Sequence, residues 1–410
     1  MLLPLSQLRI RAYKAFAGAV ALDLRPLTIV FGYNGAGKSA VCTLPAAISA
    51  GLRGEGPPGL PLVVGPHRLG ASHLDLRHGR TLQDFEVGIS QPLAAIDGQV
   101  HLDCELSADT ALSLHTPGQL MREWRLSGPD GALALRGRAG RPVEASAGPV
   151  PSGFNGLVPR WEGHHDAQPA LPEPFACVAL GAARGLGGAD FTPQRAEQRL
   201  EVGATGEDTR AAIDAAWWTG RRSVWEELQS AVAAVLDVEL SLEELVQGPV
   251  SGTVLQGRRS PHHPALPLAQ LGTGLSHALP VLTQLALLPP VAAGQRAPLL
   301  SVEEPEAHLH PAAQAQMADQ CIAAVQAGRC ALLVETHSET FILRLQRRVA
   351  EGTLEPSAVA LWWVDEEAGQ TKVRALEIDA HGAIPGWPEG WFDAALREAQ
   401  AIARAGRARR

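Results

Sequence analysis

No stretch of the sequence is apolar enough to cross a membrane, since none approaches the roughly 18 residues that a spanning helix needs. The N-terminus reads Met1-Leu2-Leu3-Pro4 and has neither a basic region nor a cleavage site, so no signal peptide is predicted. Cysteine is scarce and forms no C-x-x-C pair; the five residues lie at positions 42, 104, 177, 321 and 330. Reduced thiols in a cytoplasmic protein are therefore expected, rather than disulfides or a zinc site.

An excess of positive charge is also missing. The chain has 35 Lys and Arg against 43 Asp and Glu, a net charge of −8. A bulk attraction to nucleic acid is therefore not expected, although a local basic face stays open. The chain does have 46% hydrophobic and 19% charged residues over a length of 410. These values predict one large or two ordinary globular domains with a sizeable core.

The clearest motif is the glycine-rich segment 32–39, Gly-Tyr-Asn-Gly-Ala-Gly-Lys-Ser, which has the spacing G-x-x-x-x-G-K-[ST]. It follows an apolar run at 27–31 and precedes a helix-compatible stretch at 40–50. In a strand, glycine loop and helix of this kind, backbone N–H groups and the positive helix end bind phosphate oxygens. The sequence therefore predicts a phosphate site with these candidate contacts: Gly32, Asn34, Gly35, Gly37, Lys38 and Ser39.

Two of these residues have a specific expected role. Lys38 would neutralise the β- and γ-phosphates of a nucleotide, and Ser39 would bind Mg²⁺. Such a loop needs a partner strand that carries acids, and residues 299–306, Leu-Leu-Ser-Val-Glu-Glu-Pro-Glu, supply one. Acids at the C-terminal end of a strand lie where ligands bind in open α/β sheets. We expect Glu303 to hold the metal, directly or through water, and Glu304 to be the general base for the attacking water.

A third polar segment, Glu335-Thr336-His337-Ser338, follows the apolar run 331–334. If its strand lies beside the acidic strand, His337 can reach a γ-phosphate and sense hydrolysis. Strands and helices alternate on both sides of the glycine loop, which predicts an α/β core with a mainly parallel sheet.

The remaining segments give a coarse pattern. Alternating apolar and polar residues between 74 and 138 predict an antiparallel sheet, and the Pro- and Gly-rich stretch 139–174 predicts a loop. Residues 207–236 have helical character, and their tryptophans are expected in the core or in a contact between helices. Strands at 358–364 and 372–378 and a helix at about 391–405 complete the chain.

Together these motifs resemble the ABC-type ATPase heads of the SMC, RecF and OLD-like group, in particular the compact bacterial ATPases grouped as AAA-15 or AAA-21. Segments 303–311 and 335–338 carry this resemblance. Segment 382–393 resembles the tail of a subfamily of unknown function, and segments 180–184 and 202–207 resemble its middle part.

The resemblance implies an α/β fold: an ABC-ATPase head with a phosphate-loop mixed sheet, an antiparallel β subdomain and a helical signature subdomain. The expected division is a phosphate-loop half of the ATPase core (1–60), a β-rich subdomain with an irregular insertion (61–174), a helical and signature subdomain (175–290), the acidic-strand and histidine half of the core (291–356), and C-terminal strands with a helix (357–410).

In such heads a signature loop reaches the nucleotide of the opposite subunit. The expected equivalent is segment 271–277, before a helix predicted at 278–288; Gly272 stands where Ser is usual, and either Thr273 or Ser276 is available for the hydroxyl. With Gly274, these residues are the candidate contacts to the second nucleotide. A Mg²⁺-sensing glutamine is also expected, and Gln83 and Gln91 are both candidates.

The activity that the resemblance implies is ATP hydrolysis with Mg²⁺, by in-line attack of water, in a homodimer or higher oligomer whose heads sandwich ATP. Two roles stay open. One is a DNA-linked bacterial repair or anti-phage defence system. The other is an ATP-dependent scaffold that holds and releases a separate effector protein, such as a nuclease or toxin, without acting on DNA itself.

Overall fold

The computed structural model describes residues 1–54, 57–64, 67–81, 83–93, 98–108, 119–129, 131–136, 143–146, 150–161, 171–186, 191–193, 201–247, 250–260, 262–367, 369–388, 390–391 and 394–408. Within these ranges, no helix has the length and apolar character that a membrane span requires.

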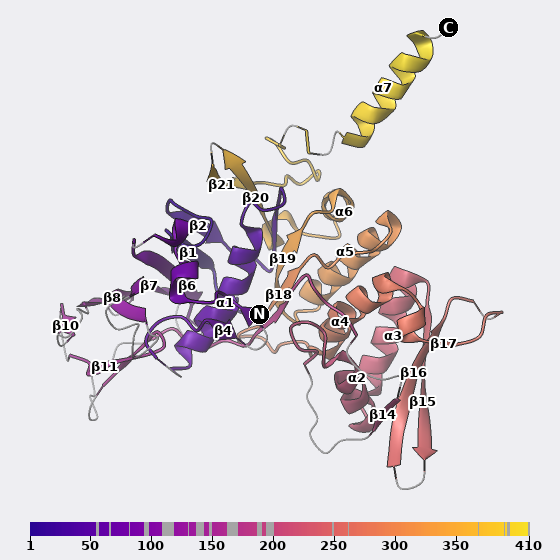
Figure 1. Ribbon diagram of the computed structural model, residues 1–410, viewed down its shortest axis with the longest axis horizontal. Coiled ribbons are helices and arrows are strands. Elements are labelled where there is room, and N and C mark those ends of the chain that lie inside the picture. The colour runs from indigo at the N-terminus through magenta and orange to yellow at the C-terminus, as the bar shows by residue number, and fades with distance from the viewer. Residues whose placement is uncertain are drawn as a thin grey trace.

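A six-stranded sheet forms the centre of the molecule (Figure 1). Its strands, in spatial order, are β13 (Cys177–Leu180), β18 (Leu299–Glu303), β19 (Ala331–Thr336), β3 (Leu27–Gly32), β20 (Val359–Glu367) and β21 (Gln370–Leu376). Neighbouring strands are parallel except for the hairpin β20–β21. The mainly parallel, mixed sheet expected from the sequence is confirmed.

The central sheet separates two hydrophobic cores, because successive side chains of each strand point to opposite faces of the sheet. Ile29 and Phe31 of β3 belong to the core that also contains the helices after residue 209. Val30 of β3 and Leu333 of β19 belong to the other core, which includes α1 (Lys38–Leu52) and the second large sheet. These strands are buried on both faces, which explains their continuous apolar sequences.

The helices of the first core follow the strands directly. α5 (Pro311–Gln326) follows β18, and α6 (Glu339–Ala350) follows β19. The N-cap of α6 is Ser338, whose hydroxyl accepts a hydrogen bond from the Phe341 N–H at 3.0 Å. Such a cap satisfies one of the free N–H groups of the first helical turn.

A helical lobe lies on one side of the central sheet (Figure 1). Its elements are β14 (Phe191–Pro193), α2 (Thr209–Trp218), α3 (Arg222–Leu236), β15 (Glu239–Gln247), β16 (Val250–Arg258), β17 (Leu266–Pro267) and α4 (Thr273–Leu287). The helical segment expected at 207–236 is two helices, which separate at Gly220 with a φ of 73°. The rings of Trp217 and Trp225 meet edge to face at 5.9 Å, so the expected contact between helices is confirmed.

An antiparallel, seven-stranded sheet lies on the other side, as the alternating pattern predicted. Its spatial order is β10 (Glu144–Ala145), β9 (Gly131–Arg136), β8 (Gln119–Gly128), β7 (Gln99–Ala108), β6 (Phe85–Pro92), β1 (Gln7–Arg11) and β2 (Val20–Asp23).

The domain division expected from the sequence stays a prediction. Two pairings cross its boundaries. β1, which lies in the expected phosphate-loop half, pairs with β6 of the antiparallel sheet. β13, from the expected helical segment, pairs with β18 of the central sheet.

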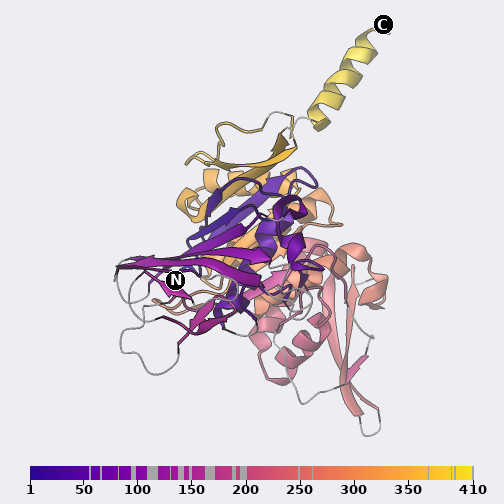
Figure 2. The same cartoon turned by 60° about the vertical axis from the view of Figure 1, so that its left-hand side comes forward.

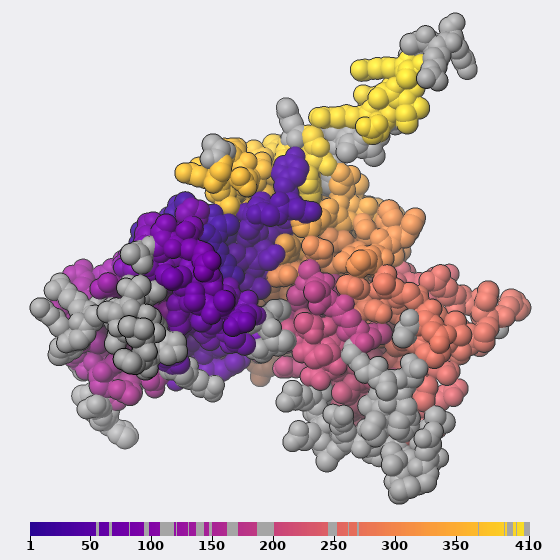
Figure 3. All heavy atoms as spheres, viewed as in Figure 1, coloured from indigo at the N-terminus to yellow at the C-terminus, as the bar shows by residue number. Residues whose placement is uncertain are grey.

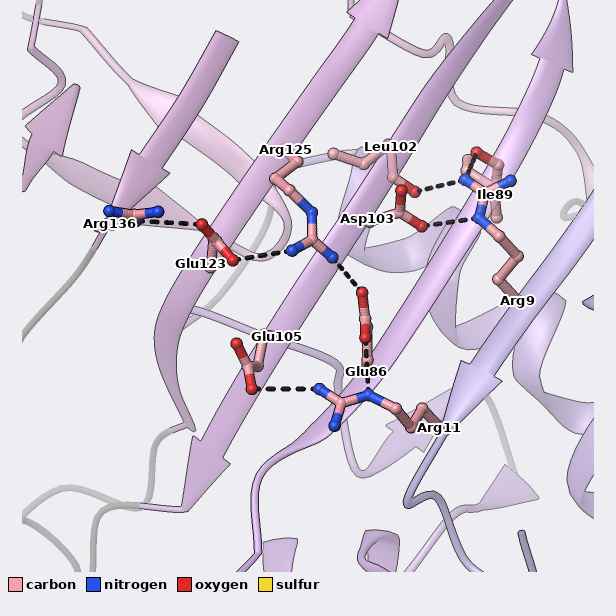
Figure 4. A network of polar contacts seen from close by, with 10 residues as sticks. All are labelled: Arg9, Arg11, Glu86, Ile89, Leu102, Asp103, Glu105, Glu123, Arg125 and Arg136. Atoms are coloured by element: carbon pink, nitrogen blue, oxygen red, sulfur yellow. Dashed lines mark hydrogen bonds and ion pairs between the residues drawn. The ribbon is translucent and has the colours of Figure 1, made fainter. Parts of the chain in front are cut away.

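One face of the seven-stranded sheet carries a network of opposite charges (Figure 4). Arg9 bonds Asp103 at 2.7 Å, and Arg11 bonds both Glu86 at 2.9 Å and Glu105 at 3.3 Å. The network continues through Glu123, Arg125 and Arg136. Opposite charges on neighbouring strands stabilise a sheet modestly. The arginines in this network are matched by as many carboxylates, so it offers no excess of positive charge to a polyanion.

The short elements are β4 (Val63–Val64), β5 (His67–Arg68), β11 (Gly153–Asn155), β12 (Val158–Arg160) and four 3₁₀ helices at His73–Leu76, His78–Arg80, Leu268–Gln270 and Pro356–Ala358. Three of the short strands, β10, β11 and β12, fall within 139–174, where the sequence predicted a loop or an irregular insertion. The local Pro and Gly content hid them, because each strand has two or three residues and depends on pairing for its stability.

The C-terminal segment packs against the strand that enters the glycine loop. Phe31 at the end of β3 lies 5.4 Å from Trp363, 5.5 Å from Trp387 and 5.0 Å from Trp391, measured between ring centroids. Thr371 of β21 also donates a hydrogen bond to the carbonyl oxygen of Ala36, at 3.1 Å. From this aromatic cluster, α7 (Ala394–Ala408) projects away from the body of the molecule in all three overall views (Figures 1, 2 and 3).

Gly32, the first glycine of the loop, packs against the backbone of β20, where a side chain would collide. The substitution Gly32→Ala tests this contact. An added Cβ would lie 1.8 Å from the Val364 carbonyl oxygen, at a φ of 149°. We expect a loss of about 3 kcal/mol or more of unfolding free energy from overpacking and backbone strain, measured by chemical denaturation. The control is Gly18→Ala, because nothing lies within 4 Å of its Cβ position. Equal stability of the two variants would contradict the packing described.

Candidate nucleotide-binding site

Three neighbouring strands end at one edge of the central sheet, and each is followed by a polar motif. β19 lies between β18 and β3, so the strand before His337 is next to the acidic strand, as expected. In the register, Glu335 is the partner of Glu303 on one side and of Val30 on the other. The sheet therefore brings the glycine loop, the acids and the histidine to the same place.

The glycine loop wraps around the ammonium group of Lys38. Gly35 and Gly37 have φ values of 80° and 102°, a conformation that favours glycine, and α1 begins directly after Gly37. The Lys38 ammonium donates hydrogen bonds to the carbonyl oxygens of Gly32 at 3.1 Å and Tyr33 at 2.7 Å. Burial lowers the pKa of Lys38, and the nearby carboxylate of Glu335 opposes this shift.

The other candidate contacts of the loop are more open. Asn34 and Gly35 are exposed at its tip, and Ser39 is exposed in the first turn of α1. Exposed polar atoms and backbone N–H groups around a buried ammonium are the arrangement expected of a phosphate cradle.

Glu335 is a site residue that the sequence reasoning missed. The Ser39 hydroxyl donates to its Oε1 at 3.0 Å, although the two residues are 296 positions apart. Burial, together with the charge of Glu303, raises the pKa of Glu335 to about 7. Only its position in the sequence pointed to this role: Glu335 is an acid near the end of a buried strand, in the segment that also contains His337.

The structure brings the expected base and the expected histidine together. His337 Nε2 lies 3.6 Å from Glu304 Oε1. Burial lowers the pKa of His337, as does the charge of Lys38, while Glu304 and a hydrogen bond with the Gly32 backbone act in the opposite direction. Glu304 has a φ of 44°, and its N–H donates to the Glu335 carbonyl oxygen at 2.7 Å. This backbone bond fixes the turn that presents Glu304.

Glu303 and Glu306 occupy different environments on either side of Glu304. The Glu303 carboxylate accepts a hydrogen bond from the Ala182 N–H at 3.2 Å. Glu306 is 5% exposed and accepts hydrogen bonds from the Thr336 hydroxyl at 2.7 Å and the His337 N–H at 2.9 Å. Glu306 therefore holds the acidic turn against the segment that carries His337.

Arg184 holds the same turn from the other side. Its guanidinium donates to the carbonyl oxygens of Glu304 at 2.8 Å, Gly181 at 2.6 Å and His277 at 3.3 Å, and also to that of Glu303. Burial lowers the pKa of Arg184 to about 10, which nearby carboxylates oppose. Through these backbone oxygens, Arg184 links the acidic turn to His277 of α4.

The helix after the expected signature loop begins earlier in the chain than predicted. The helix was placed at 278–288, but α4 begins at Thr273, so Thr273, Gly274 and Ser276 are helical. The sequence suggested a later start because the two glycines at 272 and 274 were assigned to a loop, whereas Gly274 lies in the first turn of α4. Gly272 precedes the helix with a φ of 99°, and both Gly272 and Thr273 are exposed.

A pocket of about 420 Å³ opens beside the glycine loop and is lined by Lys14, Ala15, Gly37, Ser39, Ala40, Thr43, Arg68, Leu69 and Glu303. The start of α4 does not contribute to this lining. Of the expected site residues, Gly37, Ser39 and Glu303 line this pocket, and the α4 candidates do not. Lys38, Glu304 and His337 do not line it either, but they lie near one another at the same edge of the sheet.

Neither candidate glutamine lines this pocket. The Gln91 side chain donates to the carbonyl oxygens of Pro4 and Glu173 at 3.2 Å and 2.9 Å, and accepts from the Glu173 N–H at 2.8 Å. Gln83 is exposed. Gln91 is thus engaged in a structural contact.

The residues present fit a magnesium ion. The described part of the chain contains no cluster of three His, Cys, Asp or Glu that could hold a metal. Mg²⁺ in nucleotide sites uses one or two carboxylates, with water and phosphate oxygens, rather than a cage of protein ligands. Ser39 and Glu303 share the pocket and supply oxygen donors of this kind.

Comparison with known proteins agrees with this geometry. The family model of AAA ATPase domains (AAA-15) matches residues 214–342, and a family described as a protein of unknown function (DUF3696) matches residues 354–402. Residues 214–342 therefore carry the similarity to AAA ATPase domains. The glycine loop lies before the matched range and is identified by its own sequence and geometry. No curated protein sequence matches the chain.

Solved structures support the fold. The chain is similar to a crystal structure of an SMC head bound to the C-terminal winged-helix domain of ScpA, with a TM-score of 0.52, 12% identity and coverage of 92% of this chain and 98% of that one. An SMC head domain from Thermotoga maritima matches with a TM-score of 0.42, 12% identity and coverage of 91% and 99%. The expected fold, an ABC-type ATPase head, is confirmed.

The raised pKa of Glu306 predicts a pH-dependent stability. Burial is the main cause of the shift from the ordinary value of 4.5. A carboxyl group whose pKa is raised in the folded state stabilises the fold in its protonated form. This contribution is complete below the unfolded pKa and is lost as the pH rises through the folded pKa. In Glu306→Gln this titration is removed. We expect the melting temperature of the wild type, relative to the variant, to fall as the pH rises above the ordinary carboxyl pKa of 4.5. Parallel pH profiles would contradict the assignment.

Proposed function

We propose that this ATPase hydrolyses ATP with Mg²⁺ as cofactor and that two copies dimerise around the nucleotide. The observation that supports this best is the contact of 3.6 Å between Glu304 and His337, at the sheet edge where the glycine loop also begins. A base beside a neutral ring N–H donor, facing a phosphate cradle, is suited to placing water in line with a γ-phosphate.

Each residue then has a role in the transfer. Lys38 and the loop N–H groups balance the charge of the β- and γ-phosphates. Ser39 and Glu303 would hold Mg²⁺, which when bound neutralises charge on the phosphate oxygens. Glu304 accepts a proton from water while the water oxygen bonds the γ-phosphorus and the bond to the bridging oxygen of ADP breaks. His337, whose pKa is lowered, offers a neutral N–H to the γ-phosphate.

The position of α4 supports a site shared between two copies. Gly272 and Thr273 at its start are exposed, Gly274 and Ser276 are half-buried, and none of the four lines the pocket beside the glycine loop of its own chain. A helix N-terminus attracts phosphate through its free N–H groups and its dipole. In the proposed dimer, Gly272, Thr273, Gly274 and Ser276 contact the nucleotide held by the other copy.

For the biological role, we propose a DNA-linked bacterial repair or anti-phage defence system, on the basis of the resemblance to SMC, RecF and OLD-like heads. The alternative is a scaffold that holds and releases a separate effector protein. Two observations favour this alternative: the charge-balanced face of the seven-stranded sheet, and the projecting α7, where Ile402 is 70% exposed. Stimulation of hydrolysis by duplex DNA would support the first role; unchanged hydrolysis at low salt would argue for the second.

The central prediction concerns Glu304→Gln. The variant keeps the size of the side chain but cannot accept the proton, so we expect ATP to bind and hydrolysis to fall by about 10²- to 10⁴-fold. With Mg²⁺ and ATP the variant should elute as a dimer in size-exclusion chromatography with light scattering.

Two controls make this result specific. Lys38→Ala should lose ATP binding and remain monomeric, because its loop lacks the charge that balances the phosphates. Glu351→Gln changes a helix-surface acid that bonds Arg347, and should match the wild type. Normal hydrolysis by Glu304→Gln would show that another group is the base.

A further inference from the structure

Glu335 is a buried acid, and its contacts satisfy only one of its two carboxylate oxygens. The residue is 4% exposed and lies at the carboxyl end of β19, between the glycine loop and the acidic strand. Its Oε1 accepts the hydrogen bond from Ser39. Its Oε2 is buried and has no hydrogen-bond partner among the residues that the structure describes. A buried carboxylate oxygen without a partner is destabilising, and proteins retain such groups mainly where they have a function.

The charges around Glu335 favour a bound cation. Glu303 is its partner in the register of β18 and β19, so two acids stand side by side. The positive charge of Lys38 acts on Glu335, but the Lys38 ammonium hydrogen-bonds to two loop carbonyl oxygens. A cation between the two acids would remove their repulsion and satisfy the free oxygen.

The hydrogen bond from Ser39 has a further consequence. Because the Ser39 hydroxyl donates its proton to Glu335 Oε1, the hydroxyl lone pairs are directed away from that carboxylate. They are then available to a metal ion in the pocket that Ser39 and Glu303 share. An outer acid that orients a ligand in this way increases its affinity for metal.

No glutamine takes this position in the described part of the chain. Gln91 uses both polar atoms of its amide in bonds to Pro4 and Glu173, and Gln83 lies outside the pocket lining. Glu335, by contrast, accepts the hydrogen bond from Ser39, which lines the pocket.

We propose that Glu335 is a third protein residue of the magnesium site, which orients Ser39 through Oε1 and binds the divalent cation through Oε2 together with Glu303. The inference rests on the proposed binding of Mg²⁺ and ATP. One hydroxyl and two carboxylates are hard oxygen donors, and they suit Mg²⁺ or Mn²⁺ rather than a softer metal.

The test is the affinity of the protein for Mn²⁺ in the presence of a non-hydrolysable ATP analogue, measured from the free Mn²⁺ signal in electron paramagnetic resonance. In Glu335→Gln the charge and one oxygen ligand are lost, so we expect Mn²⁺ to bind about 10- to 100-fold more weakly. Binding of a fluorescent ATP analogue in EDTA should not change, since that measurement contains no metal. A purely structural role of Glu335 would affect both measurements.

The control is Glu351→Gln, which removes an acid at the end of α6 that bonds Arg347 and Arg348, away from the site. It should leave Mn²⁺ affinity unchanged. Glu335→Asp, which keeps the charge, should recover part of the affinity and provides a second variant if Glu335→Gln does not fold.

The possible failures can be told apart. If the wild type binds Mn²⁺ with the analogue and Glu335→Gln binds it equally well, the assignment of Glu335 is overturned while the proposed function stands. If the wild type does not bind the analogue, both are overturned.

Discussion

The candidate site depends on the position of β19 between β3 and β18. This single topological fact places the end of the histidine strand in contact with both the glycine loop and the acidic strand. The hydrogen bond from Ser39 to Glu335 and the contact of Glu304 with His337 both follow from it. If β19 lay at the edge of the sheet, the loop and the acids would meet without the histidine between them.

Backbone contacts then convert this topology into a defined geometry. Arg184 binds carbonyl oxygens of the acidic turn and of His277 in α4, while Glu306 binds the segment that carries His337. The acidic turn is therefore attached to two elements at once. A displacement of α4 by a second copy of the chain would act on the turn that carries Glu304, through Arg184. The site and the proposed dimer contact are thus mechanically connected within one chain.

Local sequence patterns predicted most of the fold. Apolar runs of four to six residues marked β3, β18 and β19 because strands buried on both faces read this way. The glycine spacing marked the phosphate loop because only that backbone shape leaves the N–H groups free. The pairing of β1 with β6 was not visible, since a strand's pattern shows that it has a buried face but does not identify its neighbour.

The parts of the site that the sequence did not reveal depend on distant contacts. Glu335 gains its place from Ser39, far away along the chain, and Arg184 from carbonyl oxygens that carry no sequence signal. The start of α4 was placed too late because Gly272 and Gly274 suggested a loop, whereas the helix begins at Thr273 and includes Gly274. Each of these errors has the same origin: tertiary contacts decided the outcome at a position where local preference pointed elsewhere.

The most direct test of a site shared by two copies is complementation between two inactive variants. Lys38→Ala removes the phosphate contact, and Thr273→Glu places a negative charge at the exposed start of α4, where it is compatible with the helix but repels phosphate. Each variant alone is predicted to be inactive, and a mixture should recover ATP hydrolysis, because a mixed dimer contains one intact glycine loop facing one intact α4. A mixture that stays inactive, or a fully active Thr273→Glu, would contradict the shared site.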